Sequence, residues 1–138
     1  MKERTLLIIK PDGLERSLKD EIVNRIIKEG FEIVAEKTCR MPQGLAKELY
    51  QEHRAEAFFP ELISYITSGK VCLIVLEGEN VVKKTREIIG TTNPEKAAKG
   101  TIRGDYGLDI CRNTVHSSSS LEAAEREIAL YFRFFKLS

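Results

Sequence analysis

Two uninterrupted apolar stretches constrain the fold of this chain most strongly. They are residues 5–9 and residues 71–76, and both are bounded by charged or turn-forming residues. Stretches of this length with many β-branched side chains are typical of strands that are buried on both faces. We therefore expect both segments to be inner strands of one sheet.

The spacing of apolar residues changes between these strands. Residues 31–41 alternate between apolar and polar side chains, which predicts a strand with one buried face. Helical spacing begins after Ser17, a candidate capping residue, and ends at Gly30. Helical spacing occurs again in two segments within residues 42–66 and in residues 81–90, which predicts further helices there.

The last part of the chain adds one strand and one helix. A short strand is expected at residues 110–115, followed by a capping box from Ser119 to Glu122 and a closing helix. The order of all the elements predicts an α+β fold, a split β-α-β arrangement with a four-stranded antiparallel sheet.

Length and charge limit the possible classes of protein. We expect the 138 residues to form a single domain, residues 1–138, without a linker. The 22 Lys and Arg residues nearly balance 21 Asp and Glu residues, so a net charge of +1 does not indicate attraction to nucleic acid or to membranes. The three cysteines are widely spaced among apolar residues, which favours buried thiols in a reducing compartment. Without a signal-peptide core or a membrane-spanning apolar stretch, the expected location is cytoplasmic.

Residues 91–105 have little apolar content and no periodicity, which predicts a long loop. Such loops are uncommon in compact domains unless they are functional or disordered. The threonines, cations and glycines of this loop are suited to binding phosphate, and Lys83, Lys84 and Arg86 lie just before it. A solvated basic loop is the alternative interpretation.

His116 is one of two histidines, and it comes where the expected strand gives way to four serines. An imidazole can act as an acid, a base or a nucleophile near neutral pH, and a helix N-terminus attracts anions. A histidine that reacts with phosphate is one interpretation, although lone histidines are more often structural. Glu127 on the following helix forms either a rim salt bridge or a contact with His116.

Two further positions have both a structural and a functional interpretation. Lys10 follows an inner strand, either as a solvated terminus or as a ligand-binding group at the end of a sheet. Phe58 and Phe59 precede a proline, either as core residues or as an aromatic platform for a base. Neither a Walker A motif nor G-x-G-x-x-G occurs, so the sequence predicts neither a P-loop nor a Rossmann protein.

Several motifs together resemble the nucleoside diphosphate kinase family over residues 3–132. In chain order they are ERTL (3–6), KPDG (10–13), FFP (58–60), G-x-TNP (90–94), GTIRGD (100–105) and N-x-x-H-x-S (113–118). The resemblance implies a ferredoxin-like fold and an enzyme that moves the terminal phosphate of a nucleoside triphosphate to a nucleoside diphosphate. It also implies a ping-pong mechanism through a phosphohistidine, with broad base specificity.

The resemblance further implies a role for each candidate residue. His116 is the expected nucleophile, attacking through Nδ1, and Glu127 is expected to hold the imidazole in its reactive orientation and tautomer. Arg103 is expected to stabilise charge on the transferring group. The residues expected to bind the nucleotide are Lys10, Tyr50, Phe58, Arg86, Thr92, Arg103 and Asn113. Among these, Phe58 is expected to stack on the base.

The chemistry of phosphoryl transfer fits these roles. The reaction needs mainly positioning and neutralisation of spread charge, so one imidazole and several cations are sufficient. Stacking on Phe58 recognises the π-face of any base. We expect no metal site built from protein residues, and Mg²⁺ that arrives on the nucleotide phosphates. The implied partners are nucleoside di- and triphosphates and further copies of the chain, as a tetramer or a hexamer.

The sequence departs from the family pattern in two places. The family reads His-(Gly or Ala)-Ser-Asp-Ser, whereas four serines follow His116 here. Ser119 therefore replaces a carboxylate that would contribute about 0.3–1 kcal/mol at a helix N-terminus. We expect a serine cap to substitute, leaving activity intact and the loop less rigid. The tail, residues 133–138, also differs, and its two aromatics are expected to pack on the fold or on another subunit.

Two other functions compete with the enzyme. One is a nucleotide-binding regulatory protein without phosphotransfer, and the altered serine run is its only support. The other is binding of single-stranded nucleic acid through the basic loop and Phe58, which predicts a steep dependence on salt. The net charge near zero argues against nucleic acid as the main partner.

Overall fold

The centre of the molecule is a four-stranded antiparallel sheet with the strand order β2-β3-β1-β4. The computed structural model describes residues 2–109 and 112–135. The strands are β1 (Lys2–Ile9), β2 (Glu32–Arg40), β3 (Lys70–Glu79) and β4 (Val115–Ser117). The predicted α+β class and antiparallel sheet are therefore confirmed.

The two apolar stretches form the inner strands β1 and β3, as predicted. They pair in register along β1, with Leu6 opposite Val75 and Leu7 opposite Ile74. Side chains along each strand alternate between two cores, so that Leu6 and Val75 face one and Leu7 and Ile74 face the other. Burial on both faces explains why apolar residues do not alternate with polar residues in these stretches.

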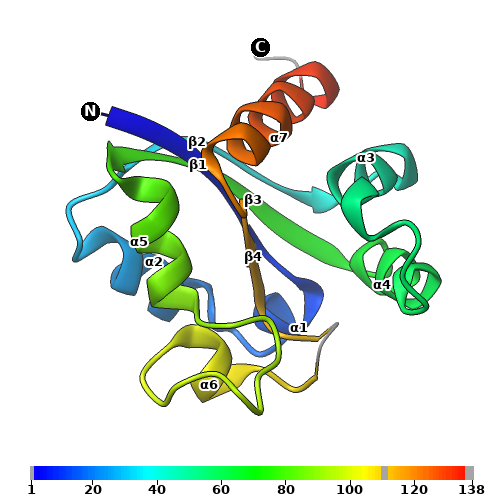
Figure 1. Cartoon of the computed structure of the whole chain (residues 1–138), viewed down its shortest axis with the longest axis horizontal. Coiled ribbons are helices and arrows are strands. Elements are labelled where there is room, and N and C mark those ends of the chain that lie inside the picture. The colour runs from blue at the N-terminus through cyan, green and yellow to red at the C-terminus, as the bar shows by residue number, and fades with distance from the viewer. Residues whose placement is uncertain (1, 110–111, 136–138) are drawn as a thin grey trace.

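Helices cover both faces of the sheet (Figure 1). The core on one side contains residues from α3 (Gln43–Leu49), α4 (Phe59–Ile66) and α7 (Leu121–Phe134). The core on the other side contains residues from α2 (Lys19–Ile27), α5 (Val81–Ile89) and α6 (Ile102–Tyr106). The short helix α1 (Pro11–Glu15) follows β1, and a 3₁₀ turn (Gln51–His53) follows α3.

The fourth strand lies further along the chain than predicted. β4 covers Val115–Ser117, so His116 lies inside the strand instead of following it. Thr114 has φ of +78°, a left-handed conformation that interrupts extended backbone, and Arg112 to Thr114 are not strand. Residues 110–111, which include Cys111, lie outside the described residues. Apolar content alone could not reveal this break.

Both predicted helix caps are shifted. Ser17 has φ of +57° and does not cap α2. Leu18 occupies the capping position, with helical backbone and without a side-chain hydrogen bond. At α7 the cap is Ser120, whose Oγ accepts a hydrogen bond from the backbone N–H of Ala123, and not Ser119. The segments expected as a turn after β1 and as the end of the long loop form the short helices α1 and α6.

Cys39 and Cys72 are free thiols on opposite sides of the sheet. Cys72 is fully buried and Cys39 is half-buried. Burial raises the pKa of both thiols. The prediction of buried thiols is therefore confirmed for Cys72 and partly for Cys39, and their placement on two faces prevents a disulfide between them.

The C-terminal helix packs its aromatic residues on the fold. Phe132 and Phe135 contact the core beside α3 and α4, and the rings of Tyr131 and Phe135 lie 5.4 Å apart. Phe134 is 37% exposed, so its predicted contact with another subunit stays a prediction. Within the described part of the chain, no helix has the length and apolar character needed to cross a membrane.

Candidate functional site

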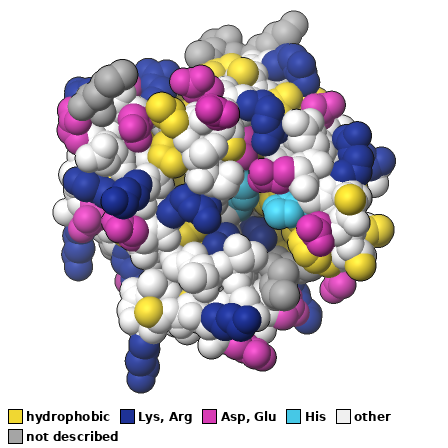
Figure 2. Space-filling model, viewed as in Figure 1, with side chains coloured by type: hydrophobic (Ala, Val, Ile, Leu, Met, Phe, Trp, Pro, Cys, Tyr) yellow, Lys and Arg dark blue, Asp and Glu magenta, His cyan; other side chains and the backbone are white. Residues whose placement is uncertain are grey.

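A cavity of about 220 Å³ brings the predicted site residues together. The predicted residues that line it are Lys10, Tyr50, Phe58, Arg86, Thr92, Arg103, Asn113 and His116. They come from the ends of β1 and α3, from α5 and α6, from β4 and from the loops between these elements. Figure 2 shows histidine side chains in a hollow on this face, with Lys, Arg and acidic side chains around them.

His116 enters this cavity from β4 and is held from behind by Glu127. His116 is 8% exposed and lies opposite Ile8 of the central strand β1. Its Nε2 atom lies 2.9 Å from Oε1 of Glu127, which is fully buried on α7. Because a carboxylate only accepts hydrogen bonds, this contact places the hydrogen of a neutral imidazole on Nε2 and leaves the lone pair on Nδ1.

Ser118 fixes the carboxylate of Glu127. Its hydroxyl donates to Oε1 of Glu127 over 2.8 Å and accepts a hydrogen bond from the backbone N–H of Leu6 over 3.2 Å. The backbone N–H of Ser118 also donates to the carbonyl of Leu6. The orientation of Glu127 is therefore tied to β1, an inner strand of the sheet.

The pKa of Glu127 lies below its usual value despite its complete burial. Burial opposes the charged carboxylate and by itself raises the pKa. The charge and hydrogen bond of His116 and the hydroxyl of Ser118 act in the opposite direction and outweigh burial. The site therefore holds a buried carboxylate that stays ionised at neutral pH and stabilises positive charge on the imidazole.

Arg103 is a buried cation at the same cavity. It is 5% exposed and donates through its two Nη atoms to the carbonyls of Gly90 (3.0 Å) and Val115 (2.9 Å). Burial, together with the charge of Arg86, lowers the pKa of Arg103 to about 10, against the opposing effect of Tyr50. The guanidinium therefore remains charged at neutral pH, next to the backbone of the strand that carries His116.

Lys10 and Asn113 connect the end of β1 to the loop before β4. The Nζ atom of Lys10 donates to Oδ1 of Asn113 over 2.8 Å, and Nδ2 of Asn113 donates to the carbonyl of Thr92 over 2.9 Å. Lys10 is 3% exposed, so the interpretation of a solvated strand terminus is wrong. The backbone N–H of Lys10 also bonds to the carbonyl of Thr114, which brings both segments to one edge of the cavity.

A row of rings leads from His116 to the outer wall of the cavity. The ring of Tyr50 meets that of His116 edge-on at 5.2 Å, and the ring of His53 lies 5.6 Å from that of Phe58. His53 lines the cavity together with Phe58, although the sequence suggested no role for it. Phe58 is half-buried and packs against the core, which agrees with the structural interpretation. Its use as a platform for a base stays a prediction.

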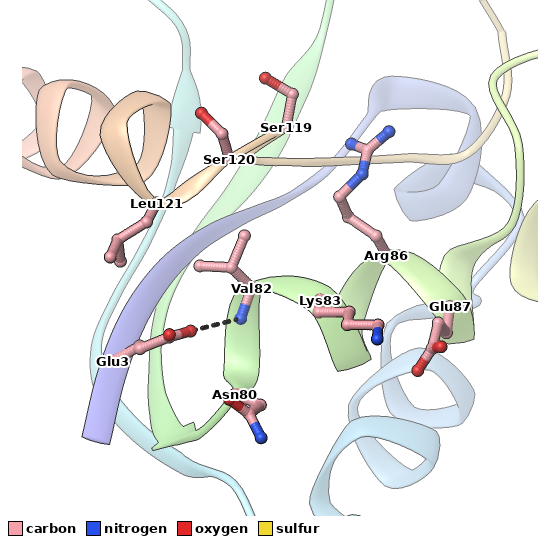
Figure 3. A pocket seen from close by; sticks show the side chains of 9 residues that line it. All are labelled: Glu3, Asn80, Val82, Lys83, Arg86, Glu87, Ser119, Ser120 and Leu121. Atoms are coloured by element: carbon pink, nitrogen blue, oxygen red, sulfur yellow. Dashed lines mark hydrogen bonds between the residues drawn. The ribbon is translucent and has the colours of Figure 1, made fainter. Parts of the chain in front are cut away.

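A second, larger cavity of about 530 Å³ lies beside the first (Figure 3). Arg86 and Ser119 line both cavities. In Figure 3, Arg86 extends from α5 toward the segment of Ser119 and Ser120, while Glu3 accepts a hydrogen bond from the backbone N–H of Val82. Among the described residues, no histidine lines the larger cavity, so His116 belongs to the smaller one alone.

Sequence reasoning missed several residues that hold the site in place. Asp12 accepts hydrogen bonds from the hydroxyls of Tyr65 (2.6 Å) and Thr114 (3.0 Å), which ties α1 to α4 and to the loop before β4. Asp12 and Ser118 belong to motifs on which the family resemblance is based, and this membership is the sequence signal that could have identified them as site residues. Tyr65 belongs to none of those motifs.

No group of three or more His, Cys, Asp or Glu side chains that could hold a metal ion occurs in residues 2–109 and 112–135. The cavity is lined by several cations, amides and hydroxyls, which are suited to binding anions. The arrangement can therefore accept phosphate groups around a histidine whose Nδ1 atom has the lone pair.

Comparison with known proteins identifies the family. The profile of the nucleoside diphosphate kinase family matches residues 3–137. The nucleoside diphosphate kinase of Staphylococcus epidermidis is 52% identical over 130 residues, which cover 94% of this chain and 87% of that protein. The enzyme of Archaeoglobus fulgidus is 49% identical over 130 residues, which cover 94% of this chain and 86% of that protein.

Solved structures agree with the sequence comparison. The nucleoside diphosphate kinase of Aquifex aeolicus superposes with a TM-score of 0.92 at 42% identity, covering all of both chains. The enzyme of Halobacterium salinarum, solved in complex with CDP, superposes with a TM-score of 0.91 at 44% identity, covering 96% of this chain and 88% of that one. The chain therefore belongs to the nucleoside diphosphate kinase family, enzymes that transfer phosphate between nucleotides.

Proposed function

We propose that His116 carries the phosphate in this enzyme. In the first half-reaction Nδ1 attacks the γ-phosphorus of a nucleoside triphosphate, and the bond from that phosphorus to the bridging oxygen breaks. The nucleoside diphosphate leaves with the electron pair. In the second half-reaction a terminal oxygen of another nucleoside diphosphate attacks the same phosphorus, and the imidazole leaves. Bonds and charges balance without a further reactant, which gives a ping-pong exchange.

The contact between Nε2 of His116 and Oε1 of Glu127 carries this proposal. It selects the tautomer in which Nδ1 is the nucleophile, and it supplies a negative charge beside the imidazole as positive charge develops there. Glu127 acts through His116, as a positioning and charge-stabilising residue. Ser118 holds Glu127 in turn, through its hydrogen bond to the same oxygen.

Arg103 is proposed to stabilise the charge on the transferring phosphoryl group. Its Nη atoms are already bonded to two carbonyls, but its buried Nε has no hydrogen-bond partner within the described part of the chain. A buried donor without a partner costs roughly 1–3 kcal/mol, which a phosphate oxygen would recover. Arg86, Thr92 and Tyr50 are proposed as further phosphate contacts around the same cavity.

Phe58 is proposed as the surface on which the base stacks, and Lys10 and Asn113 as contacts to the sugar hydroxyls and the neighbouring phosphate oxygens. The position of Phe58 on the outer wall of the cavity supports stacking without hydrogen-bond readout, and hence broad base specificity. The CDP complex of the Halobacterium salinarum relative supports a nucleotide as the ligand of this cavity.

The divalent metal is proposed to be Mg²⁺, bound to the phosphates of the nucleotide substrate and not to a protein site. We also propose a homo-oligomer, a tetramer or a hexamer, and a cytoplasmic location, where nucleoside triphosphates are used. β2 is an edge strand of the described sheet, and Val34 on it is 38% exposed, which supports a contact with another copy. Light scattering would measure the number of subunits.

Intact-protein mass spectrometry after brief incubation with Mg-ATP tests the proposed function. We expect one added phosphate that is labile in acid and removed by any nucleoside diphosphate. The variant His116→Ala should bind ATP and carry no phosphate. A native chain that binds ATP without any adduct would support the regulatory nucleotide-binding alternative instead. An adduct on His116→Ala would place the reactive group elsewhere.

A further inference from the structure

The helix that carries Arg103 is too short to hold its own position. α6 comprises the residues Ile102–Tyr106, and an isolated helix of this length is not stable in water. Its N-terminus is capped by Thr101, whose hydroxyl accepts from the backbone N–H of Gly104 over 3.0 Å. This local bond shapes the turn but does not attach it to the sheet. The direction of the Arg103 side chain must therefore depend on contacts with other elements.

Arg25, on α2, makes several of these contacts. Others come from Ile102, which is fully buried in the core, and from Arg16, which donates to the carbonyl of Tyr106. One Nη atom lies 3.0 Å from Oδ2 of Asp105 and 3.3 Å from the carbonyl of Gly100. Its guanidinium lies over the ring of Tyr106, 5.2 Å from the centroid. Its Nε donates to Glu21, one turn earlier on α2, over 2.8 Å. Arg25 thus contacts residues before and within α6, while Glu21 restrains its own side chain.

Asp105 extends this contact into the loop. Its other carboxylate oxygen, Oδ1, accepts a hydrogen bond from the backbone N–H of Gly100 over 2.9 Å. These interactions with Gly100 and Arg25 lower the pKa of Asp105. Asp105 therefore connects the two ends of the segment from Gly100 to Asp105, and Arg25 connects this segment to α2. Both side chains are only 23% exposed, so solvent screens their attraction less than at a fully exposed pair.

We propose that Arg25 is a positioning residue for phosphoryl transfer, because it fastens α6 to α2 and thereby sets the Arg103 guanidinium beside His116. The inference rests on the proposed function of Arg103 and His116. Arg25 is not among the residues that line the cavity, so it has no direct route to the nucleotide in this arrangement. Its effect reaches the reaction through the bond from Arg103 to the carbonyl of Val115, the residue before His116.

The expected effect is on the rate of the chemical step. Misplacement of a catalytic group by about 1 Å costs about 100-fold in rate, and a partly loosened helix should cost less. We therefore expect Arg25→Ala to slow phosphorylation of His116 by Mg-ATP by about 10- to 100-fold, with the Kd for ATP changed less than about threefold. Arg25→Lys should recover most of the rate, because a lysine can still reach Asp105. The matched control is Lys19→Ala, at another position of α2. It removes the ion pair between Lys19 and Glu36 of β2 and should keep the native rate.

A double-mutant cycle with Arg103→Ala separates this inference from a merely structural role. If Arg25 acts through Arg103, then Arg25→Ala should slow the reaction little further when Arg103 is already absent. The milder variant Asp105→Asn keeps an oxygen acceptor for Gly100 and removes the charge that faces Arg25, so it should also slow the reaction. It replaces Arg25→Ala in the experiment if that variant does not fold.

Single-turnover quench measurements at saturating Mg-ATP, with the folded fraction of each variant determined by circular dichroism, decide between the outcomes. The inference is supported if the rate per folded molecule falls for Arg25→Ala and Asp105→Asn but not for Lys19→Ala. A lower melting temperature with an unchanged rate per folded molecule would overturn it, as would an equal loss of rate in the Arg103→Ala background. A native chain that forms no phosphohistidine would instead refute the proposed function itself.

Discussion

The substitution Glu127→Gln removes one negative charge from the site and almost no volume. In the native protein the buried Oε1 atom accepts from Nε2 of His116 over 2.9 Å and from the hydroxyl of Ser118 over 2.8 Å. An amide can accept the same bonds, but it cannot stabilise the positive charge that develops on the imidazole. A hydrogen bond to a charged group is worth about 1.5–3 kcal/mol.

This difference sets the expected size of the effect. Since about 1.4 kcal/mol corresponds to a tenfold change, Glu127→Gln should slow the phosphorylation of His116 by about 10- to 150-fold. The stability of the fold should change by less than about 1 kcal/mol, because removal of a fully buried charge also removes its cost of desolvation. Rate and stability should therefore respond very differently to the same substitution.

Rapid-quench measurement of one turnover with Mg-ATP gives the rate, and urea unfolding gives the stability. Glu125→Gln, an exposed position on the same helix, is the control and should match the native protein in both. A native rate in Glu127→Gln would refute the argument that the carboxylate acts on the imidazole. A parallel loss of rate and stability would show that Glu127 is needed only for folding.

Three further outcomes follow from the structure. The pKa of Glu127 is depressed, so its contribution to stability is present above the ordinary value of 4.5 and is lost as the pH falls through the lower folded value; urea unfolding of Glu127→Gln should lack this part of the pH dependence, and identical profiles would contradict it. Ser119→Asp should stabilise the start of α7 by about 0.3–1 kcal/mol and slow hydrogen exchange there, with activity changed less than about threefold; unchanged exchange would count against this. Gly90→Ala should cost on the order of 1–3 kcal/mol and also slow the reaction, because a Cβ there would lie 2.5 Å from Oγ1 of Thr101 and Gly90 is a partner of Arg103. Gly30→Ala is the control, with a similar φ of +85° and open space around it, and equal effects of both substitutions would refute the clash.

The sequence was sufficient to predict the inner part of the fold. The composition of the stretches within β1 and β3 indicates their burial, and every side chain of residues 5–9 and 71–76 is buried in the structure. The motif residues around His116 also lie together as predicted, because each is held by its own short segment at one edge of the sheet.

The remaining features depend on contacts that no local pattern encodes. The start of β4 is set by the left-handed backbone at Thr114, whose hydroxyl bonds to Asp12 of α1, about a hundred residues earlier in the chain. The burial of Glu127 was ambiguous because a carboxylate at the edge of an apolar helix face has the same spacing whether it faces solvent or a histidine. Arg25 carried no motif signal at all, since its partner Asp105 becomes a neighbour only after α6 has formed.

The position of the phosphate on His116 tests the central claim most directly. The native protein, phosphorylated with Mg-ATP and kept at alkaline pH, can be examined by phosphorus–nitrogen correlation NMR with ¹⁵N-labelled histidine. Because Glu127 occupies Nε2, we expect the phosphate on Nδ1 and the hydrogen still on Nε2. A phosphate on Nε2 would contradict the account, since the contact from which the mechanism is derived would then have to break for the reaction to occur.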